Sequence, residues 1–174
     1  MKGTVVVCLQ GMVQKRYGKE KWEAILEGAG FPKYQIFTTT GDVPDQRITD
    51  LMTSSCRVLG IHLQRTFDEF AEYWMCEFGP KVYVAFYDGK RNAKEFLVTM
   101  DNVHIVVTNS MANAAPPRFT CEWKDPKTLV MHYDSKRGLI DLMVSFIKGV
   151  GKYYKEDLKI TKLGADKVEV VFAY

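Results

Sequence analysis

The sequence lacks the features that mark several common classes of protein. Its four cysteines stand far apart, so neither a CxxC metal or redox site nor a disulfide framework is indicated. No apolar run is long enough to span a membrane. No more than two Lys or Arg residues are adjacent and the net charge is only +3, which does not favour a nucleic-acid surface. We therefore expect a cytoplasmic chain with no membrane span and no nucleic-acid partner.

The common catalytic motifs are absent as well. The sequence contains no GxSxG, Walker A or HExxH motif, and no cysteine stands close to a histidine. These absences argue against the enzyme classes that such motifs identify. We expect a protein that binds or senses a ligand, and not an enzyme.

The composition predicts one globular domain, residues 1–174. A chain of this length buries roughly two-thirds of its unfolded surface. Hydrophobic residues make up 47% of the sequence and aromatic residues 13%, which leaves apolar surface to pack around something besides protein. The sequence has no internal repeat and no linker.

The hydrophobic pattern predicts helices first and then an antiparallel sheet with one inserted helix, which is an α+β fold. The expected helices are residues 3–17, 19–27, 44–59, 66–78, 93–111 and 139–150. The expected strands are residues 118–123, 128–135, 157–162 and 167–172. The fourth helix has an aromatic inward face, made by Phe67, Phe70, Trp74 and Phe78. The pair Gly79-Pro80 is expected to break that helix.

The helix predicted at residues 93–111 carries a histidine on its apolar side. Spacings of three and four place five residues on one stripe, namely Leu97, Met100, His104, Val107 and Met111. A buried imidazole needs a partner for each ring nitrogen. His104 is therefore either a core histidine that bonds a backbone carbonyl or a metal ligand, and helix geometry leaves both interpretations open.

A second polar motif, YxSxR, follows at residues 133–137. Tyr133, Ser135 and Arg137 alternate, so they would project from one face if the predicted strand continued that far. Two hydroxyls beside a guanidinium fork suit a carboxylate or a phosphate. A solvated strand end is the other interpretation of such a short motif. A buried histidine together with this clamp would suit a flat apolar ligand that has an axial metal and anionic edge groups.

At this point the sequence resembles the heme nitric oxide/oxygen binding (H-NOX) domains, which are related to the heme domain of soluble guanylate cyclase. The resemblance covers essentially the whole chain. It rests on the segment MDNVH that ends at His104, on Pro-Pro-Arg at residues 116–118, and on YxSxR at residues 133–137.

The resemblance implies a heme b held between the helical part and the sheet. It makes His104 the proximal ligand of the iron, and it makes Tyr133, Ser135 and Arg137 the clamp on the heme propionates. It makes Pro117 the residue that presses on the porphyrin and distorts it. His62 and His132 are weaker candidates for the axial ligand, because they fall in polar or edge positions.

The distal side of the heme is expected to be apolar. Oxygen-binding relatives carry a distal tyrosine at the position that aligns here with Leu142, and Phe146 one turn on is equally unable to donate a hydrogen bond. The resemblance places Val5 and Leu9 in the same pocket. Trp74 is expected to fill the distal wall, although its indole N–H, or the hydroxyl of Tyr73, could also donate.

The resemblance implies a sensor that binds NO and CO at ferrous heme and excludes O2. NO would weaken and break the bond between His104 and the iron, and the movement of helix and heme would be the signal. The expected partners are a histidine kinase, a cyclic-dinucleotide enzyme or a chemotaxis receptor. Two alternatives stay open: an O2-binding heme sensor that uses Trp74 or Tyr73 as donor, and a heme-free binding module for another apolar acid.

Overall fold

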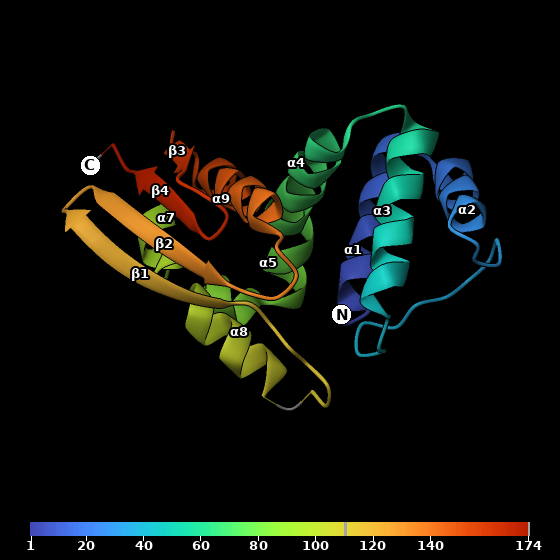
Figure 1. Cartoon of the computed structure of the whole chain (residues 1–174), viewed down its shortest axis with the longest axis horizontal. Coiled ribbons are helices and arrows are strands. Elements are labelled where there is room, and N and C mark those ends of the chain that lie inside the picture. The colour runs from blue at the N-terminus through green and yellow to red at the C-terminus, as the bar shows by residue number, and fades with distance from the viewer. Residues whose placement is uncertain (110, 174) are drawn as a thin grey trace. The chain divides into compact units, whose positions relative to one another are not determined.

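The computed structural model describes residues 1–109 and 111–173 (Figure 1). The chain divides into two compact units, Met1–Phe70 and Ala71–Tyr174. The first unit is helical, and the second combines helices with a four-stranded antiparallel sheet. This is the predicted α+β composition. Among the described residues, no helix has the length and apolar character that crossing a membrane requires.

The first unit contains the helices that the periodicity predicts. They are α1 (Thr4–Tyr17), α2 (Lys19–Gly28), α3 (Asp45–Leu59) and the larger part of α4 (Leu63–Tyr73). Helix α3 ends as predicted at Gly60, whose left-handed conformation (φ 67°) suits glycine. Apolar side chains fill the interior of this unit, among them Leu9, Met12, Trp22, Ile25 and Leu51.

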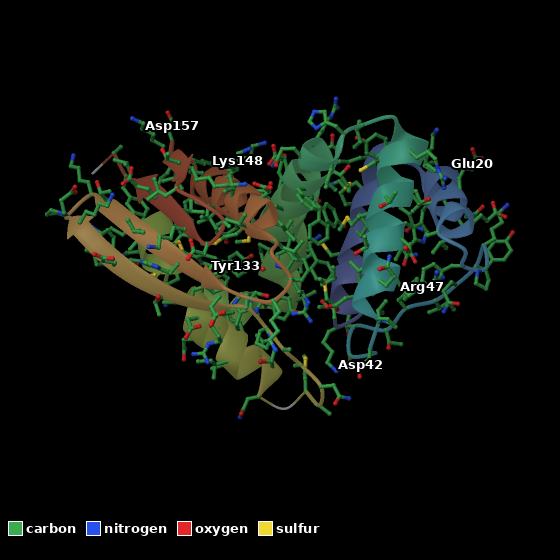
Figure 2. All side chains as sticks on the ribbon, in the orientation of Figure 1. Glu20, Asp42, Arg47, Tyr133, Lys148 and Asp157 are labelled. Atoms are coloured by element: carbon green, nitrogen blue, oxygen red, sulfur yellow. The ribbon has the colours of Figure 1, made fainter. Side chains whose placement is uncertain are left out.

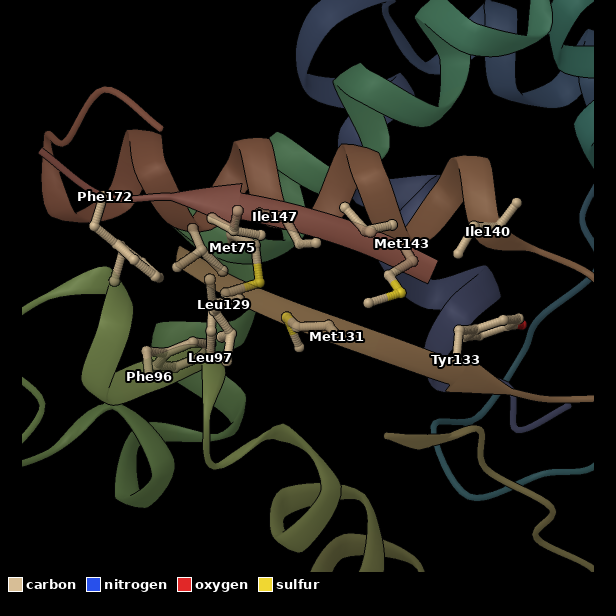
Figure 3. Close-up of a cluster of buried hydrophobic side chains, with 14 residues drawn as sticks. Met75, Phe96, Leu97, Leu129, Met131, Tyr133, Ile140, Met143, Ile147 and Phe172 are labelled. Carbon is tan, nitrogen blue, oxygen red and sulfur yellow. The ribbon is translucent and has the colours of Figure 1, made fainter. Parts of the chain in front are cut away.

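The second unit is built on a sheet in the order β1-β2-β4-β3, with every neighbouring pair antiparallel. The strands are β1 (Arg118–Asp125), β2 (Thr128–Asp134), β3 (Lys159–Lys162) and β4 (Lys167–Val171). Helix α9 (Ile140–Tyr154) is inserted between β2 and β3. Alternate residues of β2, namely Leu129, Met131 and Tyr133, belong to a buried cluster with Met143 and Ile147 of α9 (Figure 3).

The prediction that Gly79-Pro80 breaks the fourth helix is wrong. A π-helical turn (Trp74–Phe78) follows α4, and the chain continues as α5 (Gly79–Val82) and α6 (Val84–Tyr87). The N–H of Gly79 donates to the carbonyl of Trp74, five residues back. This wider turn lies directly before Pro80, so the ring avoids the carbonyl that it would meet in a regular α-helix.

The single helix predicted at residues 93–111 is also wrong. The structure has two shorter helices, α7 (Ala93–Leu97) and α8 (Met100–Thr108), and residue 110 of the predicted range lies outside the described residues. The interruption falls at Thr99, whose Oγ1 donates to the carbonyl of Phe96 at 2.7 Å. A threonine hydroxyl that takes a backbone carbonyl offers the chain an alternative to the next helical turn.

Helix α9 ends four residues later than predicted, because two glycines in its last turns do not end it. A Cβ atom on Gly149 would lie 2.9 Å from both the carbonyl oxygen of Ala71 and Cγ of Met75. Gly149 therefore allows a close approach between α9 and the segment at Ala71 and Met75. The glycine serves packing here, and not helix termination.

Candidate functional site

His104 lies on α8 with one ring nitrogen already bonded. Its Nδ1 is 2.7 Å from the carbonyl oxygen of Met100, one turn earlier, and its ring lies against Phe119 with 5.2 Å between centroids. Burial lowers the pKa of His104 below its ordinary value of 6.5, against the bond to Met100 and the charge of Asp101, which both raise it. The imidazole is therefore mainly neutral at pH 7. A carbonyl only accepts, so Nδ1 carries the hydrogen and Nε2 keeps its lone pair.

The two interpretations of His104 are thus compatible with each other. The backbone carbonyl fixes the ring and its tautomer, which is the usual arrangement behind a metal-binding histidine. Among the described residues, Nε2 has no hydrogen-bond partner. Nε2, the atom of His104 that could bind a metal, therefore remains available.

A metal held by His104 would need ligands in addition to the imidazole. No group of three or more His, Cys, Asp or Glu side chains among the described residues is arranged to hold a metal ion. A porphyrin brings four nitrogen ligands of its own and requires only an axial one from the protein. The donor set therefore fits a heme iron better than a free metal ion.

Asp101 connects α8 to the sheet. Its carboxylate accepts two hydrogen bonds from the guanidinium of Arg118, both 2.7 Å long, and a third from the backbone N–H of Phe119 at 2.9 Å. These bonds, with Arg118 as the main cause, lower the pKa of Asp101 to about 2. This link was not predicted from the sequence. Its only local signal is an aspartate one helical turn before His104.

The clamp residues are arranged differently from the prediction. Strand β2 ends at Asp134, so Tyr133, Ser135 and Arg137 do not share one strand face. The chain turns instead, with the N–H of Gly138 donating to the carbonyl of Ser135 and with Gly138 in the left-handed region (φ 61°). Inside this turn, Oγ of Ser135 accepts from the N–H of Arg137 at 3.3 Å.

Each of the two outer clamp residues contacts a different element. Tyr133 is 8% exposed, and its hydroxyl oxygen accepts a hydrogen bond from the N–H of Leu139 at 3.2 Å, at the start of α9. Figure 2 shows its side chain inside the second unit, whereas that of Asp157 lies at the periphery. Arg137 donates from Nη1 to the carbonyl oxygen of Ala115, two residues before Pro117. Arg137 thus contacts the segment before Pro117, and Tyr133 contacts the start of α9.

A surface pocket is lined by two of the three clamp residues but not by the third. Its lining includes Tyr133 and Ser135 together with Arg118, His132, Asp134 and Asp166. Arg137 is not among the lining residues, and the pocket has mixed charge. We therefore do not assign this pocket to a carboxylate.

The distal candidates of the second unit form an aromatic group. The ring of Trp74 meets Phe146 edge to face at 5.8 Å and Phe78 at 5.3 Å, and it is nearly parallel to Tyr83 at 6.1 Å. Leu142 lies one turn before Phe146 on α9 and is half-buried. Tyr83 was not predicted, since its position depends on the π-helical turn.

The remaining candidates are placed as follows. Val5 and Leu9 lie on α1 in the first unit, where Leu9 is buried and Val5 half-buried. Tyr73 is the last residue of α4 and is half-buried. His62 is exposed, and its Nδ1 accepts from the N–H of Arg65. His132 lies 3.5 Å from the carboxylate of Glu122.

The α+β fold, together with the segment MDNVH that ends at His104 and the motif YxSxR at residues 133–137, is typical of heme-based sensor domains. The family model described as Haem-NO-binding matches residues 2–162, and the chain belongs to this family. The family consists of heme-based gas sensors related to soluble guanylate cyclase, as the resemblance implied.

The relatives include two soluble guanylate cyclases of Caenorhabditis elegans. The chain is 23% identical to gcy-37 over 170 residues, which is 94% of this chain and 24% of that protein. It is 25% identical to gcy-32 over 158 residues, which is 87% of this chain and 23% of that protein. The chain thus spans about a quarter of the length of these relatives.

Solved structures show the same fold. An oxygen-binding H-NOX domain related to soluble guanylate cyclases, in its oxygen complex, superposes with a TM-score of 0.88 at 22% identity, covering 100% of this chain and 96% of that one. A structure from work on the mechanism of H-NOX activation gives a TM-score of 0.87 at 21% identity, covering 100% and 97%. These matches confirm the predicted fold class.

Proposed function

We propose that this chain binds heme b through Nε2 of His104 and senses NO, and also CO, with O2 excluded. The observation that carries the proposal is the state of His104, which is neutral and fixed through Nδ1 in a chain of the Haem-NO-binding family. Heme would supply the ferrous iron to which a gas binds opposite His104. Tyr133, Ser135 and Arg137 are proposed to hold the propionates, and Pro117 to press on the porphyrin.

The proposed gas selectivity follows from the lack of a donor on α9. Leu142 and Phe146 cannot donate a hydrogen bond. Bound O2 carries partial negative charge, and a hydrogen bond to charge is worth ~1.5–3 kcal/mol, whereas NO and CO need this help far less. A distal pocket walled by these two side chains would disfavour O2 by about one to two decades.

The proposed signal is a release of α8. With His104 bound, α8 would be held by that ligand bond and by the contacts of Asp101 with β1. When NO binding breaks the ligand bond, Asp101 would remain as the main tether and the rest of α8 would be free to move. We propose that this movement acts on a signalling partner, which is a histidine kinase, a cyclic-dinucleotide enzyme or a chemotaxis receptor.

The first test is the absorption spectrum of the protein as purified, then reduced, then exposed in turn to air, CO and NO. We expect a five-coordinate ferrous heme that ignores air, takes up CO, and is five-coordinate again with NO. A stable oxy spectrum in air would instead favour an O2 sensor with Trp74 or Tyr73 as donor. A chain that takes up no heme would favour a binding module for another apolar acid.

The second test addresses His104 directly. In His104→Gly, we expect the heme to lose its protein ligand and to regain an axial ligand when imidazole is added. The matched control is His132→Gly, which removes a half-buried histidine of β2 and should leave the spectrum unchanged. Full ligation by the protein in His104→Gly without imidazole would refute the assignment.

A further inference from the structure

Helix α9 begins without a cap from its own sequence. The first four N–H groups of a helix have no partner within it and are commonly satisfied by a polar side chain at the N-cap. The N-cap residue of α9 is Leu139, which makes no side-chain cap, and the residue before it is Gly138. The N–H of Leu139 is instead satisfied by the hydroxyl oxygen of Tyr133, 3.2 Å away.

The ring of Tyr133 is fixed in this position. It is 8% exposed and belongs to the buried cluster that includes Ile140 and Met143 of α9 (Figure 3). On its other side it lies against Phe119, with 5.9 Å between ring centroids. The hydroxyl therefore has little freedom to move away from the start of α9.

The hydroxyl of Tyr133 can still donate one hydrogen bond. A phenol both accepts and donates, and its oxygen here accepts from Leu139. Among the described residues, the hydroxyl hydrogen finds no acceptor. An anion bound at the clamp would supply one.

We propose that Tyr133 is a positioning residue that couples a carboxylate bound at residues 133–137 to the first turn of α9. The proposal rests on the proposed function, in which that carboxylate is a heme propionate. Donation to an anion makes the phenol oxygen a stronger acceptor, because hydrogen bonds in a chain polarise one another. The bond from Leu139 then strengthens when the clamp is occupied.

The stronger bond from Leu139 to Tyr133 would affect the side of the heme where the gas binds. Leu142 lies three residues after Leu139, in the first turn of α9, and Phe146 lies one turn further. Occupation of the clamp would therefore steady the turn that carries Leu142. The coupling joins the carboxylate edge of the cofactor to the helix that controls selectivity.

Hydrogen exchange measured by mass spectrometry on peptides that cover residues 139–143 tests this coupling. The protein is loaded either with heme or with heme dimethyl ester, which has no free carboxylate. We expect exchange to be slower with heme by a factor of about 1.5 to 2, because polarisation along a chain of hydrogen bonds strengthens each bond by roughly 10–30%. In Tyr133→Phe we expect the two cofactors to give the same rate.

Tyr153→Phe is the matched control. Tyr153 lies near the other end of α9, where its ring packs against Tyr87 and Tyr154, so the difference between heme and its ester should persist in this variant. An equal difference in wild type and Tyr133→Phe would overturn the proposal. Should Tyr133→Phe fail to fold, the wild type alone decides, since equal exchange with the two cofactors would also overturn it. If the proposed function itself is wrong, the result differs, because the protein then takes up no heme.

Discussion

Replacing Asp101 by Asn would show how much the ion pair with Arg118 stabilises the attachment of α8 to the sheet. The asparagine oxygen can still accept from the N–H of Phe119, so the substitution removes chiefly the ionic bond to Arg118. Folding lowers the pKa of Asp101 from 3.8 to about 2. A carboxyl whose pKa is lowered on folding stabilises the fold above its unfolded pKa, and the contribution is lost as the pH falls toward the folded pKa.

The size of the effect can be bounded. A fall in pKa from 3.8 to about 2 corresponds to a ceiling of about 2.4 kcal/mol in the free energy of unfolding. Solvent reduces this value, because the side chain of Arg118 is 55% exposed and that of Asp101 is 27% exposed. We expect Asp101→Asn to cost about 1 kcal/mol at pH 7 and almost nothing near pH 2.

Urea unfolding of wild type and Asp101→Asn between pH 7 and pH 2, followed by circular dichroism, measures this difference. Both proteins must be in the same heme state, so that the acid sensitivity of all other groups cancels. Glu95→Gln is the matched control, since Glu95 also binds an arginine, Arg91, but four residues away on the surface. We expect a much smaller loss there, because solvent screens an exposed ion pair. Stability curves of wild type and Asp101→Asn that run parallel from pH 5 to pH 2 would refute the reasoning.

Three further substitutions test separate parts of the structure. Pro117→Ala should flatten the porphyrin in a crystal structure of the heme-bound protein, and an unchanged heme would remove Pro117 from the mechanism. Leu142→Tyr should supply the missing donor and raise O2 affinity about 10- to 100-fold, read as a stable oxy spectrum in air. Gly149→Ala should lower the free energy of unfolding by about 1–3 kcal/mol, because its Cβ would meet Ala71 and Met75. The control is Gly164→Ala, whose Cβ meets nothing closer than 3.8 Å and which should be nearly neutral in the same urea titration.

Much of the fold could be predicted because its causes are local. The turn between β1 and β2 is an example, since Oδ1 of Asp125 accepts from the N–H groups of both Lys127 and Thr128. The end of α3 at Gly60 is another. The outcome at Gly149 could not be predicted, because it depends on a carbonyl 78 residues earlier in the chain, that of Ala71. The same applies to the π-helical turn before Pro80, whose local sequence has no distinguishing pattern.

The candidate site also has features that the sequence predicted and features that it could not predict. The apolar stripe around His104 indicated an inward-facing imidazole, and the structure adds the Met100 carbonyl that fixes its tautomer. The pairing of Asp101 with Arg118 joins residues 17 positions apart and carries no periodic signal. For the clamp, alternation suggested one shared face, but a turn at Gly138 sends the chain into α9 and separates the three side chains.

The attachments of α8 suggest how its movement would begin. Asp101 lies in the first turn of α8 and is held to β1 by three hydrogen bonds. Later in α8, the side chains of His104 and Thr108 bond within the helix, to the carbonyls of Met100 and His104, and the His104 ring lies against Phe119. Loss of the ligand bond should therefore loosen residues 105–108 and leave residues 100–103 protected. Hydrogen exchange with and without NO measures this, and we expect faster exchange only in the later residues. Equal acceleration along all of α8 would show that the helix leaves the sheet as a unit and that Asp101 does not act as its pivot.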